Sequence, residues 1–204
     1  GNNGAGKSTF ARCLCGLDKR ALGELELNGH SYRAKQRCHI SYMVMQDVNH
    51  QLFTEDVLDE LLLSMDGEDE KENTEWANQI LSSLDLAAKI KLHPMSLSGG
   101  EKQRVAIGSA IASNKEILVF DEPTSGLDYF HMVEVSDNLN RLKDMGKSLF
   151  LITHDPELIY KCCTYLLFIQ ENKVLWHRPM DDEAIKLLRA FFSHEKGANI
   201  INAS

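Results

Sequence analysis

The sequence predicts an α/β fold: a core with a mostly parallel sheet, an antiparallel β portion near the amino terminus and an inserted helical subdomain. Three observations indicate this class. A hairpin pattern comes first, about fifty residues with helical periodicity follow, and helices then alternate with apolar strands from residue 101 onward. The 204 residues suit one domain, which can bury roughly 70% of its unfolded surface.

Short β elements are expected in the first quarter of the chain. Residues 24–27 alternate between acidic and apolar side chains, and Asn28-Gly29 is a favoured two-residue turn. We therefore expect a hairpin over residues 23–32. Residues 39–45 are apolar and β-branched enough to form a further strand.

The pattern changes between residues 47 and 97. Residues 54–65 and 72–84 have helical periodicity, and the acidic stretch 66–70 between them contains a glycine. The simplest interpretation of this acidic stretch is a solvated loop, and a metal site is the alternative. We therefore predict a helical subdomain over about residues 47–113, inserted into the α/β core.

Helices and strands are expected to alternate after this subdomain. Such alternation implies right-handed crossovers and a parallel sheet. The final residues, 197–204, carry no pattern. The expected elements are a helix over 101–113, a strand over 116–120, a helix over 130–145, a strand over 148–153, a hairpin of 165–169 and 173–177, and a helix over 182–192.

The first eight residues match the phosphate-binding pattern G-x-x-x-x-G-K-[ST] without a mismatch. Its glycines allow successive N–H groups to turn toward an anion, Lys7 would bring a charge to the β- and γ-phosphates, and the Ser8 hydroxyl can bind Mg²⁺. A short helix is expected over 9–17, with its positive end toward the phosphates. The pattern predicts a nucleoside triphosphate site in a P-loop NTPase (RecA-like) core, and a tight turn is the alternative. The residues of this site are Gly1, Asn2, Asn3, Gly4, Ala5, Gly6, Lys7, Ser8 and the following Thr9.

A buried strand is expected to end in two carboxylates, Asp121 and Glu122. Ligands of open α/β sheets bind at the carboxyl ends of strands, so both acids are expected near the nucleotide. Asp121 suits Mg²⁺, mostly through water, and Glu122 would polarise the water that attacks the γ-phosphate. A solvated turn is the alternative, but the four apolar residues before the pair and residues 123–128 after it disfavour such a turn.

Residues 98–101 start the helix that precedes this strand. Ser98 and Glu101 form a capping-box pattern, which is a routine helix start. That pattern does not explain Gly99 and Gly100, which open the helix end so that N–H groups and the helix dipole can face an anion. Both interpretations can hold, with the box positioning a phosphate-binding helix end.

These motifs, in this order and spacing, resemble the ATP-binding subunits of ABC transporters over most of the chain. The resemblance implies a dimer with a second ATP-binding domain, identical or similar, in which residues 98–101 contact the ATP of the opposite subunit and Asp128 lines the interface. It also implies that Gln46 senses Mg²⁺, water and the membrane partner, and that His154 contacts the γ-phosphate. In that family a strand and an adenine-stacking ring precede the phosphate loop. We therefore expect this chain to be a fragment of a longer domain, lacking its upstream strands.

Residues 46–53 further resemble the ATPases of energy-coupling-factor importers for vitamins, cobalt or nickel. Those proteins commonly carry a second glutamine followed by an apolar pair, here residues 51–53. Two positions depart from the family, because no proline follows Gln46 and Tyr129 stands where many relatives have proline. The resemblance implies an ATP hydrolase that uses ATP and Mg²⁺ to power import, bound to a transmembrane subunit at the cytoplasmic face of the cell membrane.

Leu52 and Phe53 are bulky apolar residues directly after a polar loop. Such a pair suits a shallow groove for an amphipathic coupling helix of the membrane subunit. The alternative is that both side chains pack into the core of the helical subdomain.

Charge and composition disfavour other classes. The net charge of −8, from 22 basic and 30 acidic residues, disfavours sequence-independent nucleic-acid binding, so no nucleic-acid partner is expected. No apolar stretch approaches the roughly 18 residues that a membrane helix needs. The five cysteines lack metal-site spacing and are expected as small buried residues of a reducing cytoplasm. A soluble ABC ATPase that acts on ribosomes, DNA or iron–sulfur cluster assembly is the alternative function.

Overall fold

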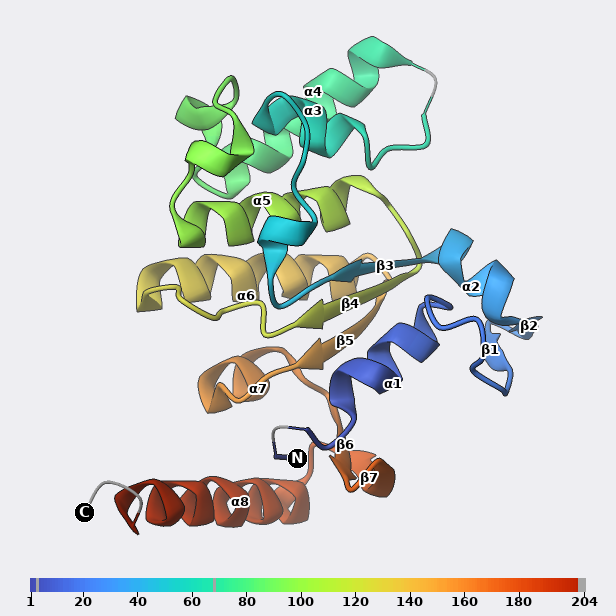
Figure 1. Ribbon diagram of the computed structural model, residues 1–204, viewed down its shortest axis with the longest axis vertical. Helices are drawn as coiled ribbons and strands as arrows, with labels where there is room; N and C mark the ends of the chain where they lie inside the picture. Colours follow the sequence, from blue (N-terminus) through green and yellow to red (C-terminus); the bar gives the residue numbers. More distant parts are fainter. Residues whose placement is uncertain (3, 68, 202–204) are drawn as a thin grey trace. The chain divides into compact units, whose positions relative to one another are not determined.

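The computed structural model describes residues 1–2, 4–67 and 69–201, and the chain forms two compact units. The larger unit is Ser8–Cys162, and the smaller one combines Gly1–Lys7 with the chain from Cys163 onward. Each unit is described by itself below, with the elements labelled as in Figure 1.

The larger unit is organised around a parallel sheet of β3 (Ser41–Val44), β4 (Ile117–Asp121) and β5 (Ser148–Ile152), in the order β3-β4-β5 within the described residues. Figure 1 shows the three arrows pointing the same way. The register places Phe120 opposite Val44 on one side and opposite Leu151 on the other. The prediction of an α/β fold with a parallel sheet is confirmed.

Helices cover both faces of this sheet, because alternate residues of a strand point to opposite faces. Leu118 and Phe120 belong to the larger core, which includes residues of α5 and α6, whereas Ile117 and Val119 pack with residues of α1. A central strand that is buried on both faces is apolar throughout, as β4 is before Asp121. The remaining elements of the unit are α1 (Lys7–Leu14), β1 (Leu25–Leu27), β2 (His30–Tyr32), α2 (Ala34–Ile40), α3 (Val57–Leu62), α4 (Glu70–Ser83), α5 (Gly99–Ala112), α6 (Tyr129–Asp144), α7 (Pro156–Cys162) and the 3-10 turns η1 (Val48–His50), η2 (Ala87–Lys89) and η3 (Pro94–Ser96).

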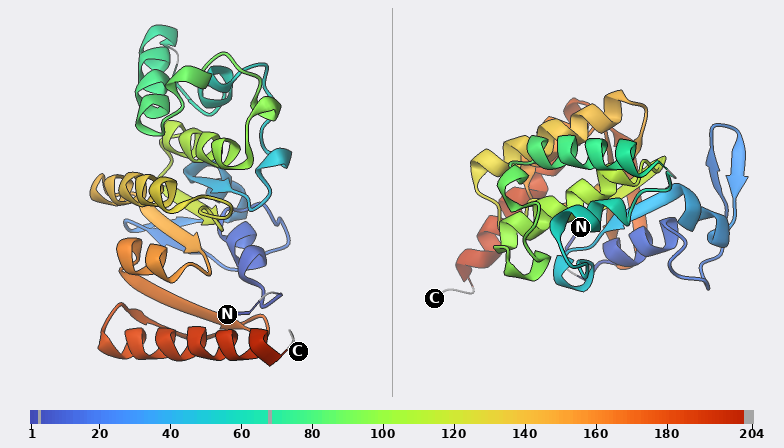
Figure 2. Two further views of the ribbon diagram at one scale, coloured as in Figure 1. Left: turned by 90° about the vertical axis from the view of Figure 1, so that its left-hand side faces the viewer. Right: turned by 90° about the horizontal axis from the view of Figure 1, so that it is seen from above.

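The helices between β3 and β4 pack on one another. Both α3 and α4 contact α5, and Figure 2 shows them beside it while the β1–β2 hairpin projects away from these helices. The antiparallel β1–β2 pair, with Leu27 opposite His30, confirms the predicted hairpin. The boundaries of a helical subdomain over 47–113 stay a prediction, since α3, α4 and α5 belong to the same compact unit as the sheet.

Capping contacts explain where several elements begin. The predicted helix over 54–65 is shorter, because Asp56 accepts a hydrogen bond from Asp59 N–H and α3 starts at the following residue. Conversely, α4 starts two residues earlier than predicted, because Asp69 accepts from the N–H groups of Lys71 and Glu72. In the same way Ser98 caps α5, so both glycines lie inside that helix rather than before it.

The predicted strand over 39–45 was wrong in its first two residues and in its last, since β3 ends at Val44. His39 and Ile40 close α2, and the strand starts at Ser41, whose hydroxyl donates to the carbonyl of Arg37 at 2.7 Å. The guanidinium of Arg37 is buried and donates to three backbone carbonyls, those of Cys13, Gly23 and Tyr32. The contacts to Cys13 and Gly23, which are 24 and 14 residues away in the chain, help to hold α2 as a helix up to Ile40.

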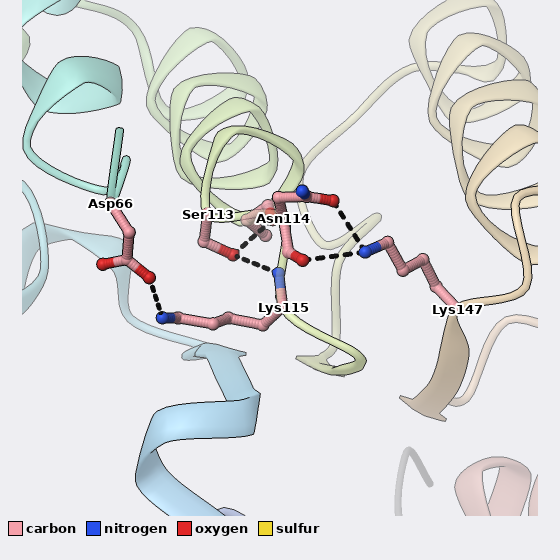
Figure 3. Close-up of polar contacts among 6 residues, drawn as sticks. Asp66, Ser113, Asn114, Lys115 and Lys147 are labelled. Carbon is pink, nitrogen blue, oxygen red and sulfur yellow. Dashed lines mark hydrogen bonds and ion pairs between the residues drawn. The ribbon is translucent and has the colours of Figure 1, made fainter. Parts of the chain in front are cut away.

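A polar cluster holds the amino ends of β4 and β5 (Figure 3). Lys147 Nζ donates to the backbone oxygen and to the side-chain oxygen of Asn114, both at 2.7 Å. Lys115 forms an ion pair with Asp66, and its N–H donates to the Ser113 hydroxyl. Part of the acidic stretch 66–70 therefore pairs with a lysine and caps a helix.

The smaller unit contains an antiparallel hairpin and a helix. The strands β6 (Tyr165–Gln170) and β7 (Lys173–Pro179) meet at Glu171 and Asn172, whose φ angles of 50° and 60° suit a two-residue hairpin turn. Phe168 stacks on Trp176 with ring centroids 5.2 Å apart. This hairpin confirms the prediction, and α8 (Asp182–Ile201) extends nine residues beyond the predicted helix end at 192.

Two further expectations concern burial. Cys15 and Cys162 are buried as predicted, but Cys38 is exposed, so burial does not account for all five cysteines. Among the described residues, no helix is both long enough and apolar enough to cross a membrane.

Candidate functional site

The phosphate loop lies in the smaller unit, and its backbone requires glycine at two positions. Gly4 and Gly6 have φ angles of 75° and 97°, a region that L side chains rarely adopt. A Cβ on Gly6 would also lie 2.7 Å from Asn172 Oδ1, because the hairpin turn packs on the loop and Asn172 N–H donates to Ala5 O at 3.1 Å. The predicted loop glycines therefore have a conformational reason and a steric one.

Lys7 lies over the same loop. Its Nζ donates to the carbonyl of Gly1 at 2.6 Å and to that of Asn2 at 3.0 Å. Asn3, also predicted to bind ATP, lies outside the described residues. A glycine-containing loop of N–H groups with an ammonium above it fits the phosphates of a nucleotide.

The first turn of α1 carries Ser8 and Thr9, both exposed. Figure 1 shows this turn on the side toward which the arrows of the sheet point. The helix has no acidic side chain in its first turn, so no carboxylate of that turn opposes an anion at its positive end. Ligands of open α/β sheets bind at this edge.

Asp121 and Glu122 end β4 at the same edge. Asp121 is 5% exposed and closes the strand. Glu122 continues the pairing, since its N–H donates to Ile152 O at 2.8 Å. Both carboxylates are therefore positioned by the sheet rather than by a loose turn, which was the alternative interpretation.

Glu122 has an unusual backbone and a close imidazole neighbour. Its φ angle of 53° is in the left-handed region, which costs a non-glycine residue energy and often marks a functional site. One carboxylate oxygen accepts from His154 N–H at 3.3 Å, and the other lies 3.6 Å from His154 Nε2. The structure thus brings together the two residues that were predicted to be catalytic.

The turn after Glu122 is tied to the segment after His154. Thr124 Oγ1 donates to Asp155 Oδ2 at 3.4 Å, and the other oxygen of Asp155 accepts from the N–H groups of Glu157 and Leu158. Sequence reasoning missed both Asp155 and the helix α7 that it caps. The Asp155-Pro156 pair was a usable signal, because aspartate at N-cap and proline at the first position often start a helix.

The start of α5 is held by the predicted capping box. Ser98 N–H donates to Glu101 Oε2 at 2.8 Å, and Glu101 N–H donates to Ser98 Oγ at 3.4 Å. These bonds, with Lys89 at 3.2 Å, lower the pKa of Glu101 to about 2. The carboxylate is ionised at neutral pH, and the capping interpretation of these two residues holds.

Gly100, in the first turn of this helix, lies beside the turn that carries Asp128. A Cβ on Gly100 would be 3.2 Å from the Leu127 side chain, whereas nothing lies within 4 Å of one on Gly99. Asp128 caps α6 and accepts from the N–H of His131 at 2.9 Å, which lowers the Asp128 pKa. The segments that were assigned to a dimer interface are therefore neighbours within one chain.

Gln46 lies in the loop after β3 and its side chain is exposed. The three residues predicted to bind metal, Ser8, Asp121 and Gln46, would offer a hydroxyl, a carboxylate and an amide oxygen. Mg²⁺ prefers such hard oxygen ligands, so this donor set fits the metal.

Comparison with known proteins agrees with these motifs. The family model described as "ABC transporter" matches residues 1–125. A putative ABC transporter ATP-binding protein of Treponema denticola is 44% identical over 176 residues, which are 86% of this chain but 35% of that protein. A methionine import ATP-binding protein of Bacillus subtilis is 35% identical over 186 residues, covering 86% of this chain and 54% of that protein. A putative ABC transporter ATP-binding protein of Pyrococcus furiosus is 32% identical over 185 residues, covering 87% of this chain and 70% of that protein.

Solved structures show the same fold. A dimeric ATP-binding cassette in a post-hydrolysis state, bound to ADP and Pi, superposes with a TM-score of 0.76 at 25% identity, covering 88% of this chain and 83% of that chain. A nucleotide-free ATP-binding cassette gives a TM-score of 0.78 at 23% identity, covering 93% and 81%. The predicted P-loop core is confirmed. The chain spans about a third of the length of the first relatives it matches.

Proposed function

Because the chain belongs to the ABC transporter family of ATP-hydrolysing domains, we propose that it binds and hydrolyses ATP to power transport across a membrane. The observation that carries the proposal is the Glu122–His154 pair at the carboxyl ends of β4 and β5. A carboxylate held beside an imidazole at this edge is suited to orient an attacking water.

The phosphate loop and the first turn of α1 would bind the triphosphate. Lys7 would move from its present carbonyl partners to the β- and γ-phosphates, and loop N–H groups would donate to the phosphate oxygens. Ser8, Asp121 and Gln46 would hold Mg²⁺, directly or through water. Bound Mg²⁺ supplies positive charge to the phosphate oxygens.

Glu122 would accept a proton from the water that attacks the γ-phosphate. Its left-handed backbone and the sheet bond to Ile152 O fix its carboxylate, so little reorganisation is needed during the reaction. The imidazole of His154 would donate to the γ-phosphate, while the backbone N–H of His154 donates to the Glu122 carboxylate. General-base catalysis of this kind contributes on the order of 10²–10⁴ in rate.

A second ATP-binding domain, identical or similar, would complete the site. The start of α5, with residues 98–101, would contact the ATP held by the other domain, and Asp128 would line the interface. The proximity of Gly100 to Leu127, which precedes Asp128, supports this arrangement, because a Cβ on Gly100 would lie 3.2 Å from the Leu127 side chain. Solved neighbours with this fold form dimers.

A transmembrane subunit of an energy-coupling-factor importer is the proposed partner, which would place the domain at the cytoplasmic face of the cell membrane. Leu52 is 3% exposed and packs in the core, whereas Phe53 is 72% exposed. Leu52 therefore fits the alternative of packing in the core, whereas the exposed Phe53 can line a shallow groove that receives an amphipathic coupling helix.

The proposal is tested in the complete protein with Mg-ATP. We expect Lys7→Ala to abolish tight ATP binding, and Glu122→Gln to keep ATP binding while turnover falls and a dimer with intact ATP accumulates on size exclusion. Glu75→Gln, at an exposed position on α4, is the matched control and should behave as the parent. Parental turnover in Glu122→Gln would refute the role of Glu122 as the base.

The membrane partner is tested by co-purification. Phe53→Glu should leave ATP binding intact and reduce both recovery of the membrane subunit and transport. Leu175→Glu places the same charge on an exposed leucine of β7 and serves as the control. Full recovery and transport with Phe53→Glu would place the docking surface elsewhere.

A further inference from the structure

The side chain of Gln51 occupies the outer edge of β3. Its Oε1 accepts from Met45 N–H at 3.1 Å, and its Nε2 donates to Met43 O at 2.9 Å. In the described part of the chain β3 pairs only with β4, so this edge has no strand beside it. The amide of Gln51 satisfies backbone groups that an edge strand otherwise leaves open.

The pattern of these two bonds is that of a parallel ladder. In such a ladder, one residue of a neighbouring strand donates to the carbonyl before the facing residue and accepts from the N–H after it. The Gln51 amide does the same around Val44, which is itself fully buried. The end of β3 is thus fixed by one side chain with both hydrogen-bonding functions.

These bonds close the segment from Met45 to Gln51 into a ring that contains Gln46. Val48 is buried on one side of the ring, and its 3-10 turn is capped by Asp47. The Gln46 side chain is exposed. It extends from the backbone segment that the Gln51 hydrogen bonds close.

The chain that leaves the ring is also held by α3. Glu60 is buried, and its Oε2 accepts from Phe53 N–H at 3.0 Å and from the N–H and hydroxyl of Thr54 at 3.1 and 2.8 Å. Gln51 Nε2 also lies 3.4 Å from Tyr42 Oη. Gln51 thus lies between two functional positions, Gln46 on one side and Phe53 on the other.

We propose that Gln51 is a positioning residue that holds Gln46 at the carboxyl edge of the sheet and links its position to the segment that carries Phe53. The inference rests on the proposed ATP hydrolysis. Gln51 touches neither nucleotide nor metal in this account. It acts through Gln46, so its loss should change turnover and the demand for Mg²⁺ more than the affinity for ATP.

The test is a double-mutant cycle in the complete protein, with turnover measured against ATP and against Mg²⁺. Gln51→Met keeps the length of the side chain and removes both hydrogen bonds. We expect kcat to fall on the order of tenfold and the Mg²⁺ concentration for half-maximal rate to rise, with KM for ATP little changed. In a Gln46→Ala background, Gln51→Met should add no further loss, because residues that act through one another are not additive.

Two variants separate hydrogen bonding from bulk. Gln51→Glu keeps an acceptor for Met45 N–H but sets a carboxylate oxygen against the carbonyl of Met43, so it should lower kcat at least as much as Gln51→Met. Gln79→Ala removes an exposed glutamine of α4 and should match the parent. Thermal unfolding of each variant is measured in parallel.

Additive losses in the cycle, or parental kcat and Mg²⁺ dependence in Gln51→Met, would overturn the inference. Failure of both Gln51 variants to fold would also overturn it, since the role would then be structural alone. If instead the parent shows no ATP turnover, and Glu122→Gln changes nothing, the proposed function fails rather than the role of Gln51.

Discussion

Replacing Glu122 by glycine and by alanine separates the strain of its backbone from the chemistry of its carboxylate. A left-handed conformation costs an L residue about 1–2 kcal/mol, and glycine adopts it without this cost. Alanine at φ 53° keeps the strain, as glutamate does. Both substitutions remove the bond from His154 N–H, which is worth about 1 kcal/mol.

The balance of these contributions gives an unusual order of stability. Glycine loses about 0.5–1 kcal/mol relative to alanine through the entropy of the unfolded chain. The relieved strain exceeds this loss, so Glu122→Gly should be about 0.5–1 kcal/mol more stable than Glu122→Ala and close to the parent. Turnover should fall on the order of 10²–10⁴-fold in both variants, since neither has a base.

Urea unfolding followed by tryptophan fluorescence gives the free energies of unfolding, and Mg-ATP turnover gives the activity. Gly99→Ala, whose glycine has an ordinary φ and nothing within 4 Å of an added Cβ, calibrates the effect of the same pair of residues on stability without strain. If Glu122→Ala proves as stable as Glu122→Gly or more so, Glu122 is not strained. If both variants turn over at the parental rate, the general-base role is refuted.

Three further variants address the loop, the cap and the buried cation. Gly6→Ala should weaken nucleotide binding at least tenfold, because its Cβ would meet Asn172 Oδ1 at 2.7 Å and φ is 97°; equilibrium binding measures this, and unchanged affinity in a folded variant would contradict it. The pKa of Glu101, lowered from 4.5 to about 2 by its bond from Ser98 N–H, predicts stabilisation that is full above pH 4.5 and lost as the pH falls toward 2. The difference in free energy of unfolding between the parent and Glu101→Gln, measured by urea unfolding, should therefore shrink as the pH falls over this range. A difference that stays constant with pH would refute the lowered pKa of Glu101. Arg37→Ala should cost about 3 kcal/mol or more, because three backbone carbonyls lose their donor, whereas a loss below 1 kcal/mol would show that water replaces the guanidinium.

Local signals accounted for the parts of the fold that could be predicted. The hairpin turn at Asn28 and Gly29 needs positive φ, and both residues have it, at 52° and 77°. The apolar run of β4 ends at Asp121, as the burial of a central parallel strand requires. In each case the decisive interaction lies within a few residues, so one sequence suffices.

Contacts between distant segments decided what could not be predicted. The strand before Gln46 starts late because Arg37 reaches three carbonyls elsewhere in the chain, which no periodicity reveals. Likewise, the residues of the candidate site could be chosen from motifs, but the backbone of Glu122 depends on Ile152 and His154 in the next strand and beyond. The roles of these residues stay predictions.

The helix α5 has a mechanical consequence. Its 14 residues span about 21 Å, with Gly100 beside Leu127 at one end and the Asn114–Lys147 hydrogen bond just past the other. Because a helix tilts more easily than it bends, a displacement of the end that carries Gly100 would tilt the whole of α5. A tilt of about 5° moves the far end by about 2 Å over this length, enough to strain the lysine contact at the root of β5. The strained Lys147–Asn114 contact would oppose the tilt and restore the position of α5 once the displacement ends.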